Sequence, residues 1–130
     1  MGLPLAFEII RTVLGQHLNV KCVTDVPASR PQRFVSIDGS ATVGASHSGV
    51  KARVLGRRRL IIYCWGTSEV DAAEMAEDAR DILLRLPEMR LGARRVDIVG
   101  EPARRDYIVG EQKVHDRYVF TVDVTLRANP

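Results

Sequence analysis

The sequence predicts an α+β fold, in which a mainly antiparallel sheet carries two helices on one of its faces. Two amphipathic patterns with the helical period, at Leu3–Leu18 and after Ser68, predict the helices. Short runs rich in Val, Ile, Phe and Tyr predict strands between and after them. In the closing run, Arg117–Arg127, apolar and polar residues alternate, so one face of the sheet is expected to be packed and the other wet. This combination favours helices confined to a single face of the sheet.

The length and charge of the chain limit the function classes. With 130 residues and no internal repeat or linker, the sequence predicts a single domain over residues 1–130. The net charge is only +3, from 19 basic and 16 acidic side chains, a weaker excess than a nucleic-acid-binding protein usually has. No apolar run approaches the roughly 20 residues that span a bilayer, and Met1–Glu8 lacks the basic start of a signal peptide. We therefore expect synthesis in the cytoplasm, no membrane partner and no specific nucleic acid.

The first half of the chain predicts one helix and several strands. Pro4 fits the first turn of the Leu3–Leu18 helix, and Gly15 lies where that helix is expected to fray. The strands are predicted at Val20–Thr24, Arg33–Asp38, Val50–Leu55 and Leu60–Trp65. The last of them is continuously apolar, as expected of a central strand covered on both faces. Ser40–Gly49 is small and polar, which predicts a mobile loop near 40–49, and Gly56 with the three arginines after it is interpreted as a turn or strand edge.

The second helix has the clearest local signal. Ser68 is its predicted N-cap, and Asp71 completes a capping-box-like pair. Acidic residues crowd its first turns, where they offset the helix dipole, and Pro87 is expected to end it. The predicted buried face consists of Val70, Ala72, Ala73, Ala76, Ala79, Ile82, Leu83 and Leu86. Its alanines allow the helix to approach a sheet closely.

The second half of the chain predicts two further strands. They are Arg95–Gly100, followed by a break at Glu101-Pro102, and the final strand Arg117–Arg127. Between them, Ala103–Asp116 is interpreted as a second mobile loop, near 103–116. The residues of the final strand that are expected to face the core are Tyr118, Phe120, Val122, Val124 and Leu126.

No pattern in the sequence predicts catalysis, a cofactor or a metal site. There is no phosphate-binding glycine loop and no nucleophile elbow. His17, His47 and His115 are scattered rather than spaced as metal ligands. Cys22 and Cys64 lie in apolar, strand-like runs and are interpreted as buried free thiols, while a disulfide between them stays open. We therefore expect a protein that is not an enzyme.

Two charged clusters are candidate contact sites. Arg57–Arg59 is either a solvated turn or an electrostatic contact with an acidic partner surface or with DNA passing nearby. The helix carboxylates are either a solvated face, helped by Glu77–Arg80 and Asp81–Arg85 pairs, or a surface for arginines of a neighbouring subunit. They are Glu69, Asp71, Glu74, Glu77, Asp78 and Asp81. Trp65 is interpreted as a core or helix-packing residue rather than a base-stacking platform.

The order of these elements and the local sequence of several segments resemble those of the tail terminator, or minor tail, proteins of long-tailed bacteriophages and prophages. The segments that carry the resemblance are Arg33–Gly39, Arg59–Ser68 leading into Glu69–Ala76, Gly100–Pro102, and Arg117–Arg127. Together with the leading helix, they cover nearly the whole chain. The sequence departs from the family at Ala103–Asp116, where family members more often carry a shorter, Asp-Pro-rich connection.

The resemblance implies an α+β subunit of a ring, usually a hexamer, in the virion tail. Such a ring caps the tail tube, stops its polymerisation and presents a surface to the head-tail connector protein. The partners implied are thus the chain itself, the major tail tube protein and the connector. The residues that we expect at subunit or tube contacts are Arg57, Arg58, Arg59, Glu74, Glu77, Asp78, Asp81, Arg104 and Arg105. The arginines of 57–59 and the helix carboxylates are expected on complementary faces of adjacent subunits.

Other functions remain open at this point. One is another head–tail joining protein, such as a neck or tail-completion component. A second is a small nucleic-acid-binding module that uses the arginine cluster, whose binding would weaken steeply with salt. A third is a small enzyme of ferredoxin-like build, for which the sequence offers no site.

Overall fold

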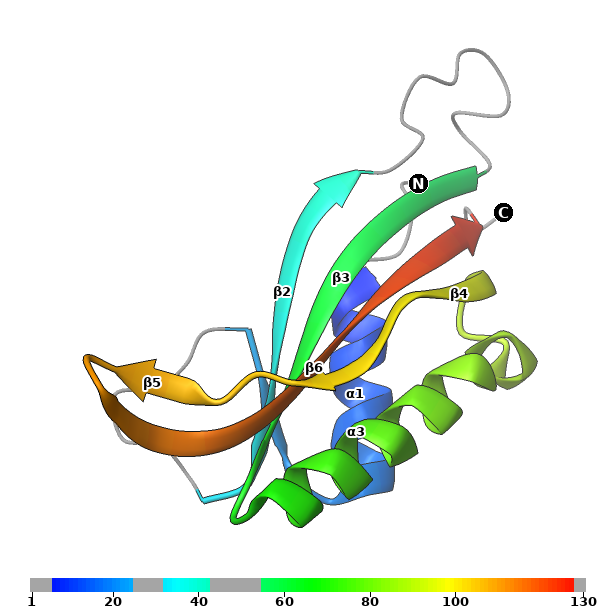
Figure 1. Ribbon diagram of the computed structural model, residues 1–130. Coiled ribbons are helices and arrows are strands. Elements are labelled where there is room, and N and C mark those ends of the chain that lie inside the picture. The colour runs from blue at the N-terminus through cyan, green and yellow to red at the C-terminus, as the bar shows by residue number, and fades with distance from the viewer. Residues whose placement is uncertain (1–5, 25–31, 43–54, 128–130) are drawn as a thin grey trace.

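The computed structural model describes residues 6–24, 32–42 and 55–127, and it contains two α-helices and a six-stranded, mostly antiparallel sheet within these ranges (Figure 1). The elements in chain order are α1 (Ala6–Leu18), β1 (Lys21–Val23), β2 (Phe34–Thr42), β3 (Leu55–Gly66), α3 (Glu69–Leu84), the 3-10 helix η1 (Leu86–Met89), β4 (Ala93–Arg104), β5 (Tyr107–Val109) and β6 (Gln112–Arg127). This confirms the predicted α+β fold. Neither helix in the described ranges is long and apolar enough to cross a membrane.

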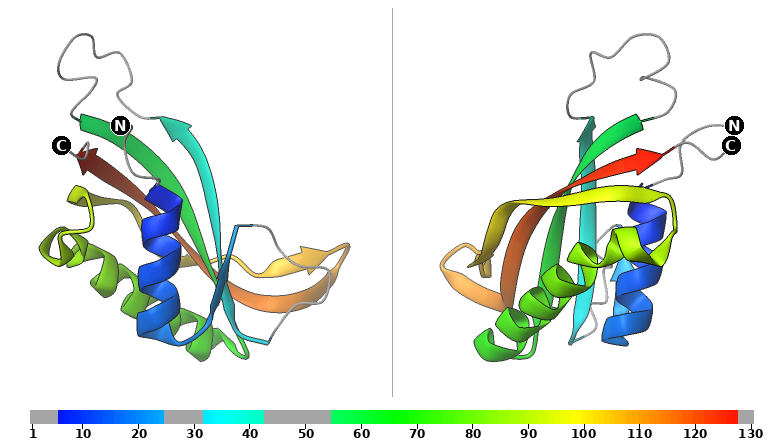
Figure 2. Two further views of the ribbon diagram at one scale, coloured as in Figure 1. Left: turned by 180° about the vertical axis from the view of Figure 1, so that it is seen from behind. Right: turned by 90° about the vertical axis from the view of Figure 1, so that its right-hand side faces the viewer.

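The strands are ordered β1-β2-β3-β6-β4, and β5 pairs with the first part of β6. Only β1 and β2 are parallel; the other pairs are antiparallel. The long strands β3 and β6 pair from Leu55↔Arg127 to Gly66↔Asp116 and form the strongly curved centre of the sheet. Both helices lie on one side of this sheet, as the two views in Figure 2 show.

The hydrophobic core lies between the helices and the sheet. From β6 it contains Phe120, Val122, Val124 and Leu126, as the alternation predicts. From β3 it contains Leu60, Ile62 and Cys64, and the helices add Ile10, Leu14, Ala72, Ala76, Ala79 and Leu83. The alanines let α3 lie close to the sheet. Val70 was predicted to belong to the buried face of this helix, but it is 65% exposed.

The start of α3 depends on a close approach between helix and strand. Ser68 caps the helix, with its side-chain oxygen accepting from the Asp71 backbone N–H at 3.1 Å. The Asp71 carboxylate does not complete a capping box; it accepts from the Thr67 N–H and from Arg33 Nε, both at 2.9 Å. A Cβ on Gly66 would lie 2.4 Å from the Ala72 backbone nitrogen, so only glycine fits at this position. The helix ends at Leu84, and Pro87 lies inside η1.

Several predicted boundaries in the first half are wrong. β2 continues to Thr42, so residues 40–42 of the predicted loop belong to a strand, while 43–49 and the predicted strand at 50–54 lie outside the described residues. Arg57–Arg59 form no turn, because they lie inside β3 and pair with β6. Nor is β3 covered on both faces along its length, since Ile61 and Tyr63 are half-buried on the side away from the helices.

The predicted loop at Ala103–Asp116 is mostly strand. β4 runs through Glu101 and Pro102 with a shift of register, rather than breaking there. β5 then pairs with the start of β6 across a tight turn in which Gly110 has φ +64°. We call residues 107–115 the arm; Figure 1 shows that it bends away from the body of the molecule.

The cysteines are free thiols, as predicted, and the sheet register explains why they do not pair. Cys22 is opposite Val35, and Val35 is opposite Cys64, so the two cysteines are separated by a whole strand. Two strand spacings amount to about 9.6 Å, beyond the roughly 7 Å that a disulfide allows between Cα atoms.

Candidate functional site: the open face of the sheet

The side of the sheet away from the helices, which we call the open face, is the candidate site. The pairing aligns alternate residues of its strands in rows: Phe34 with Trp65 and Arg117, Ser36 with Tyr63 and Val119, and Arg59 with Asp123. The alternation that sends Phe120 and Val122 into the core sends these residues to the open face. The face has an aromatic end, a half-buried middle at Ile61, Tyr63, Val119 and Thr121, and a charged end.

The aromatic end is built around Trp65. Its ring stacks on Phe34 with centroids 4.9 Å apart, and its Nε1–H donates to Ser36 Oγ at 2.9 Å. Tyr107 and His115 of the arm each lie 5.4 Å from the Trp65 ring. Trp65 is therefore buried, which confirms the expected core position, and it packs beneath the arm rather than against a helix.

Arg117 completes the aromatic end. Its guanidinium carbon lies 4.8 Å from the centre of the Tyr63 ring, 4.9 Å from that of Trp65 and 5.6 Å from that of Tyr107. Its Nε donates to the Arg105 carbonyl oxygen at 2.9 Å, which fixes the plane of the group. Burial lowers the pKa of Arg117. Tyr, Trp and Arg held rigidly together are the residues that dominate binding energy at protein interfaces.

The charged end is a cluster of ion pairs in which three arginines contact two aspartates. Arg59 holds the buried Asp123 carboxylate through two hydrogen bonds, of 2.8 and 3.0 Å, and these raise the pKa of Arg59. Arg57 lies 3.8 Å from Asp123 and 3.9 Å from Asp97. Arg58 faces the opposite side and bonds the Arg57 carbonyl oxygen. The structure thus divides the predicted arginine cluster, and it uses two of its members to hold the sheet together.

The predicted carboxylates of α3 lie away from the open face, on the solvent side of the helix. Glu74, Glu77 and Asp78 are exposed and have no ion-pair partner among the described residues. The expected side-chain pairs of this helix are replaced: Arg80 bonds Glu101 of β4 at 2.7 and 3.1 Å, and Arg85 bonds the backbone oxygen of Asp81. The carboxylates of 74–81 and the arginines of 57–59 therefore do not meet within one copy.

Arg104 and Arg105 lie at the base of the arm. Arg104 bonds Asp106, which lowers the pKa of that carboxyl, and it lies 2.8 Å from Glu69 at the start of α3. The Arg105 N–H donates to the Arg117 carbonyl oxygen at 2.8 Å. These contacts anchor the arm to α3 and to β6.

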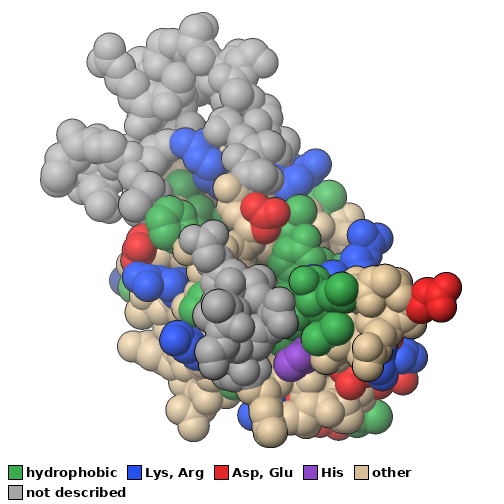
Figure 3. Space-filling model, turned by 90° about the vertical axis from the view of Figure 1, so that its left-hand side faces the viewer, with side chains coloured by type: hydrophobic (Ala, Val, Ile, Leu, Met, Phe, Trp, Pro, Cys, Tyr) green, Lys and Arg blue, Asp and Glu red, His purple; other side chains and the backbone are tan. Residues whose placement is uncertain are grey.

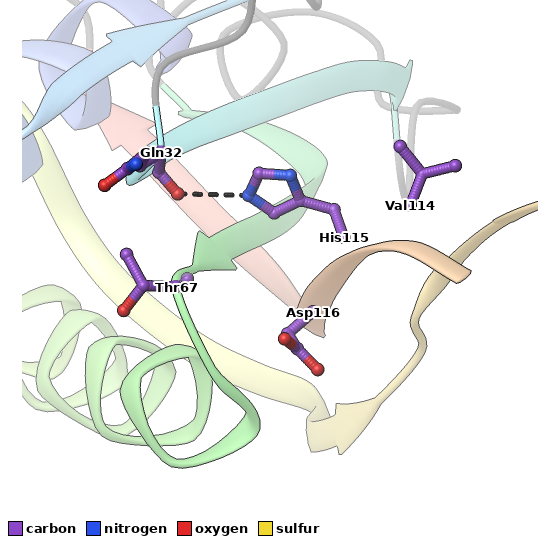
Figure 4. A pocket seen from close by; sticks show the side chains of 6 residues that line it. Gln32, Thr67, Val114, His115 and Asp116 are labelled. Atoms are coloured by element: carbon purple, nitrogen blue, oxygen red, sulfur yellow. Dashed lines mark hydrogen bonds between the residues drawn. The ribbon is translucent and has the colours of Figure 1, made fainter. Parts of the chain in front are cut away.

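A shallow pocket of about 230 Å³ lies between the arm and the turn before α3 (Figure 4). Its lining includes Thr67, Val114 and Asp116, and the His115 ring points across it to the Gln32 carbonyl oxygen at 3.0 Å. Within the described part of the chain, no group of three or more His, Cys, Asp or Glu is placed to hold a metal. The pocket is thus lined mainly by polar side chains from the arm and from the turn before α3.

Sequence reasoning missed most of the aromatic end, which consists of Phe34, Tyr63, Tyr107, His115 and Arg117 around Trp65. The signals that could have found it are the alternation in β6, which extends back to Arg117, and the spacing of two residues between Tyr63 and Trp65 in β3. What the sequence lacked was the register that aligns these strands and the arm that returns Tyr107 and His115 to them.

No protein-family model matches the chain, and no curated protein matches its sequence.

Proposed function

We propose that this chain is a structural virion assembly protein, a tail terminator that forms a hexameric ring on the tail tube of a long-tailed bacteriophage or prophage. The ring caps the tube, stops its polymerisation and provides the surface for the head-tail connector. The α+β fold with helices on one face is the fold that the resemblance implies.

The observation that carries the proposal is the open face with its aromatic end. Tyr63 and Arg117 are half-buried and are held by the cation–π contact between them and by the contact of Arg117 with the buried Trp65, so a partner that binds them orders few side chains. Rigid aromatic and guanidinium groups beside a half-buried apolar strip suit a protein partner. The two helices lie on the other side of the sheet.

The charged end favours a protein partner over nucleic acid. Phosphate binding requires guanidinium groups that are free to exchange counterions. Arg59 is occupied by Asp123, and Arg57 lies between two carboxylates, which lowers the positive potential of the face. The arginine cluster therefore supports a nucleic-acid-binding module less well than the sequence alone suggests.

The test measures the mass of the purified protein by light scattering over a concentration series, alone and with the tail tube protein of the same virion. We expect a ring-sized species and, by electron microscopy, tubes that stop growing when the protein is added. Tyr63→Ala is expected to reduce capping at least about tenfold, as loss of an interface hot spot does. Arg11→Ala, on the exposed side of α1, is the matched control and should cap normally.

Each contrary outcome has a separate meaning. A protein that stays monomeric and leaves tube growth unchanged would contradict the terminator function. Labelling of the neck rather than the tube end on virions would indicate another head–tail joining protein. A DNA mobility shift at physiological salt would indicate a nucleic-acid-binding module.

A further inference from the structure

The arm ends in an apolar surface that the described residues of one copy leave about half exposed. Ile108 and Val109 are 58% and 56% exposed, and Val114 is 46% exposed. Figure 3, which looks at the side from which the arm projects, shows hydrophobic side chains gathered beside a histidine. Glu111 in the turn is exposed and has no ion-pair partner among the described residues. The tip is thus an apolar hairpin end that carries one free carboxylate.

A basic, open pocket lies at the other end of the molecule. It has a volume of about 350 Å³ and is lined by Pro87, Arg90, Gly92, Ala93 and Arg94, where η1 leads into β4. Leu91, between two of the lining residues, is 47% exposed. Arg90 and Arg94 have no ion-pair partner in the described ranges, and Glu88 is the acidic residue nearest to them in sequence. Figures 1 and 2 agree that the arm and this end of α3 point in opposite directions.

We propose that the arm tip of one copy docks into the η1–β4 pocket of the next copy. Ile108 and Val109 cover Leu91 and the pocket wall, and Glu111 pairs with Arg90 or Arg94. The occupant is a second copy because the tip and the pocket complement each other in apolar character and charge, and no single copy can join its own two ends. The inference rests on the proposed ring function and names the surfaces that close the ring.

The geometry of this contact is head-to-tail. Each copy offers a different surface to each of its neighbours, and such a heterologous contact repeats around a closed ring instead of ending at a dimer. The arm is suited to this role because its base is fixed by Arg104, Arg105 and Arg117, whereas no residue of its tip, 108–114, belongs to the hydrophobic core. Docking also removes exposed apolar surface from a two-stranded hairpin, which is marginally stable when it projects alone.

The test combines charge reversal with rescue. Glu111→Arg and Arg94→Glu are each expected to weaken self-association about tenfold or more in sedimentation experiments, because each places like charges at the contact. Joining both reversals in one chain should restore the dissociation constant to within about threefold of the original. Glu8→Arg, the same change of charge on α1, is the matched control and should leave association unchanged.

Cysteine cross-linking then tests the direction of the contact. Gln112→Cys at the tip and Leu91→Cys at the pocket should give a disulfide-linked dimer only when the two variants are mixed. With both cysteines in one chain, cross-linking should yield a ladder that ends at the ring. The native thiols do not compete, because both are buried or half-buried inside the sheet.

The outcomes separate this contact from the proposed function. Cross-links in a single variant alone, their absence in the mixture, or rings formed equally well by Glu111→Arg would overturn the docking. If the Glu111→Arg protein still forms rings that cap tubes, the terminator function stands and only the contact is wrong. If the cross-linked ladder forms but tubes are never capped, the contact stands and the function is wrong.

Discussion

At the scale of the residue, the buried indole N–H of Trp65 depends on the hydroxyl group of Ser36. Ser36 accepts the hydrogen bond of the indole Nε1–H at 2.9 Å, and both residues are buried on the open face. An indole N–H that is buried without an acceptor costs the free energy of its lost hydration. The hydroxyl therefore holds the aromatic end in place although it touches no partner itself.

Ser36→Ala is expected to lower the free energy of unfolding by about 1–3 kcal/mol, because it leaves the Trp65 N–H unsatisfied. The measurement is urea unfolding followed by far-ultraviolet circular dichroism. The control is the same substitution in a Trp65→Phe background, where no N–H remains and the cost should nearly vanish. An equal loss in both backgrounds would mean that the hydrogen bond contributes nothing.

The cysteines give a second prediction at this scale. Burial raises the pKa of Cys22 to about 12 and raises that of Cys64 as well. The thiolate is the reactive form, so at pH 8 only about one Cys22 side chain in ten thousand is reactive. Labelling of the native protein with a disulfide reagent should be slow and should accelerate about tenfold per pH unit, as the thiolate fraction does. In denaturant both thiols should react rapidly. Rapid labelling of the native protein at pH 8 would contradict the burial of the two cysteines.

At the scale of the element, the turn from β3 to α3 depends on Gly66. Gly66→Ala would place a methyl group 2.4 Å from the backbone nitrogen and 2.8 Å from the Cα of Ala72. Because helix backbone cannot yield as a flexible side chain can, we expect a loss of about 1–3 kcal/mol in unfolding free energy. Gly100→Ala is the control, since its nearest contacts lie at 3.6 Å on the Thr121 side chain. Equal stability of the two variants in thermal unfolding would refute the close approach.

The elements that sequence alone could predict are those with local signals. Ser68 before an amphipathic run located α3, and the alternation in β6 separated core residues from those of the open face. The arm was missed because its strands are short and their pairing is recognised only once β6 is known to begin at Gln112. The sequence left the arginines of 57–59 as a turn or strand edge because Asp123, the buried partner that allows Arg59 inside a strand, is distant in the sequence. The long-range register between strands decides both the pairing of the arm and the position of these arginines. A single sequence does not contain that register.

At the scale of the whole molecule, the fold separates a stable body from a projecting tip. The body holds the hydrophobic core between the helices and the sheet, and none of its buried members comes from residues 108–114. Tyr107 and His115, by contrast, pair with each other and cover Trp65. The arm thus contributes to the body through its base, whereas its tip is available for contacts between copies.

Replacement of residues 108–114 by Asn-Gly tests this division. Tyr107 and His115 face each other across the hairpin, and Asn-Gly is the two-residue connection that suits such a pair. The shortened protein should unfold within about 0.5 kcal/mol of the original, because the tip buries little surface. Its Trp65 fluorescence should stay that of a buried indole, while self-association and tube capping should be lost. A shortened chain that still assembles would show that copies meet elsewhere, and one that no longer unfolds cooperatively would show that the tip belongs to the folding unit.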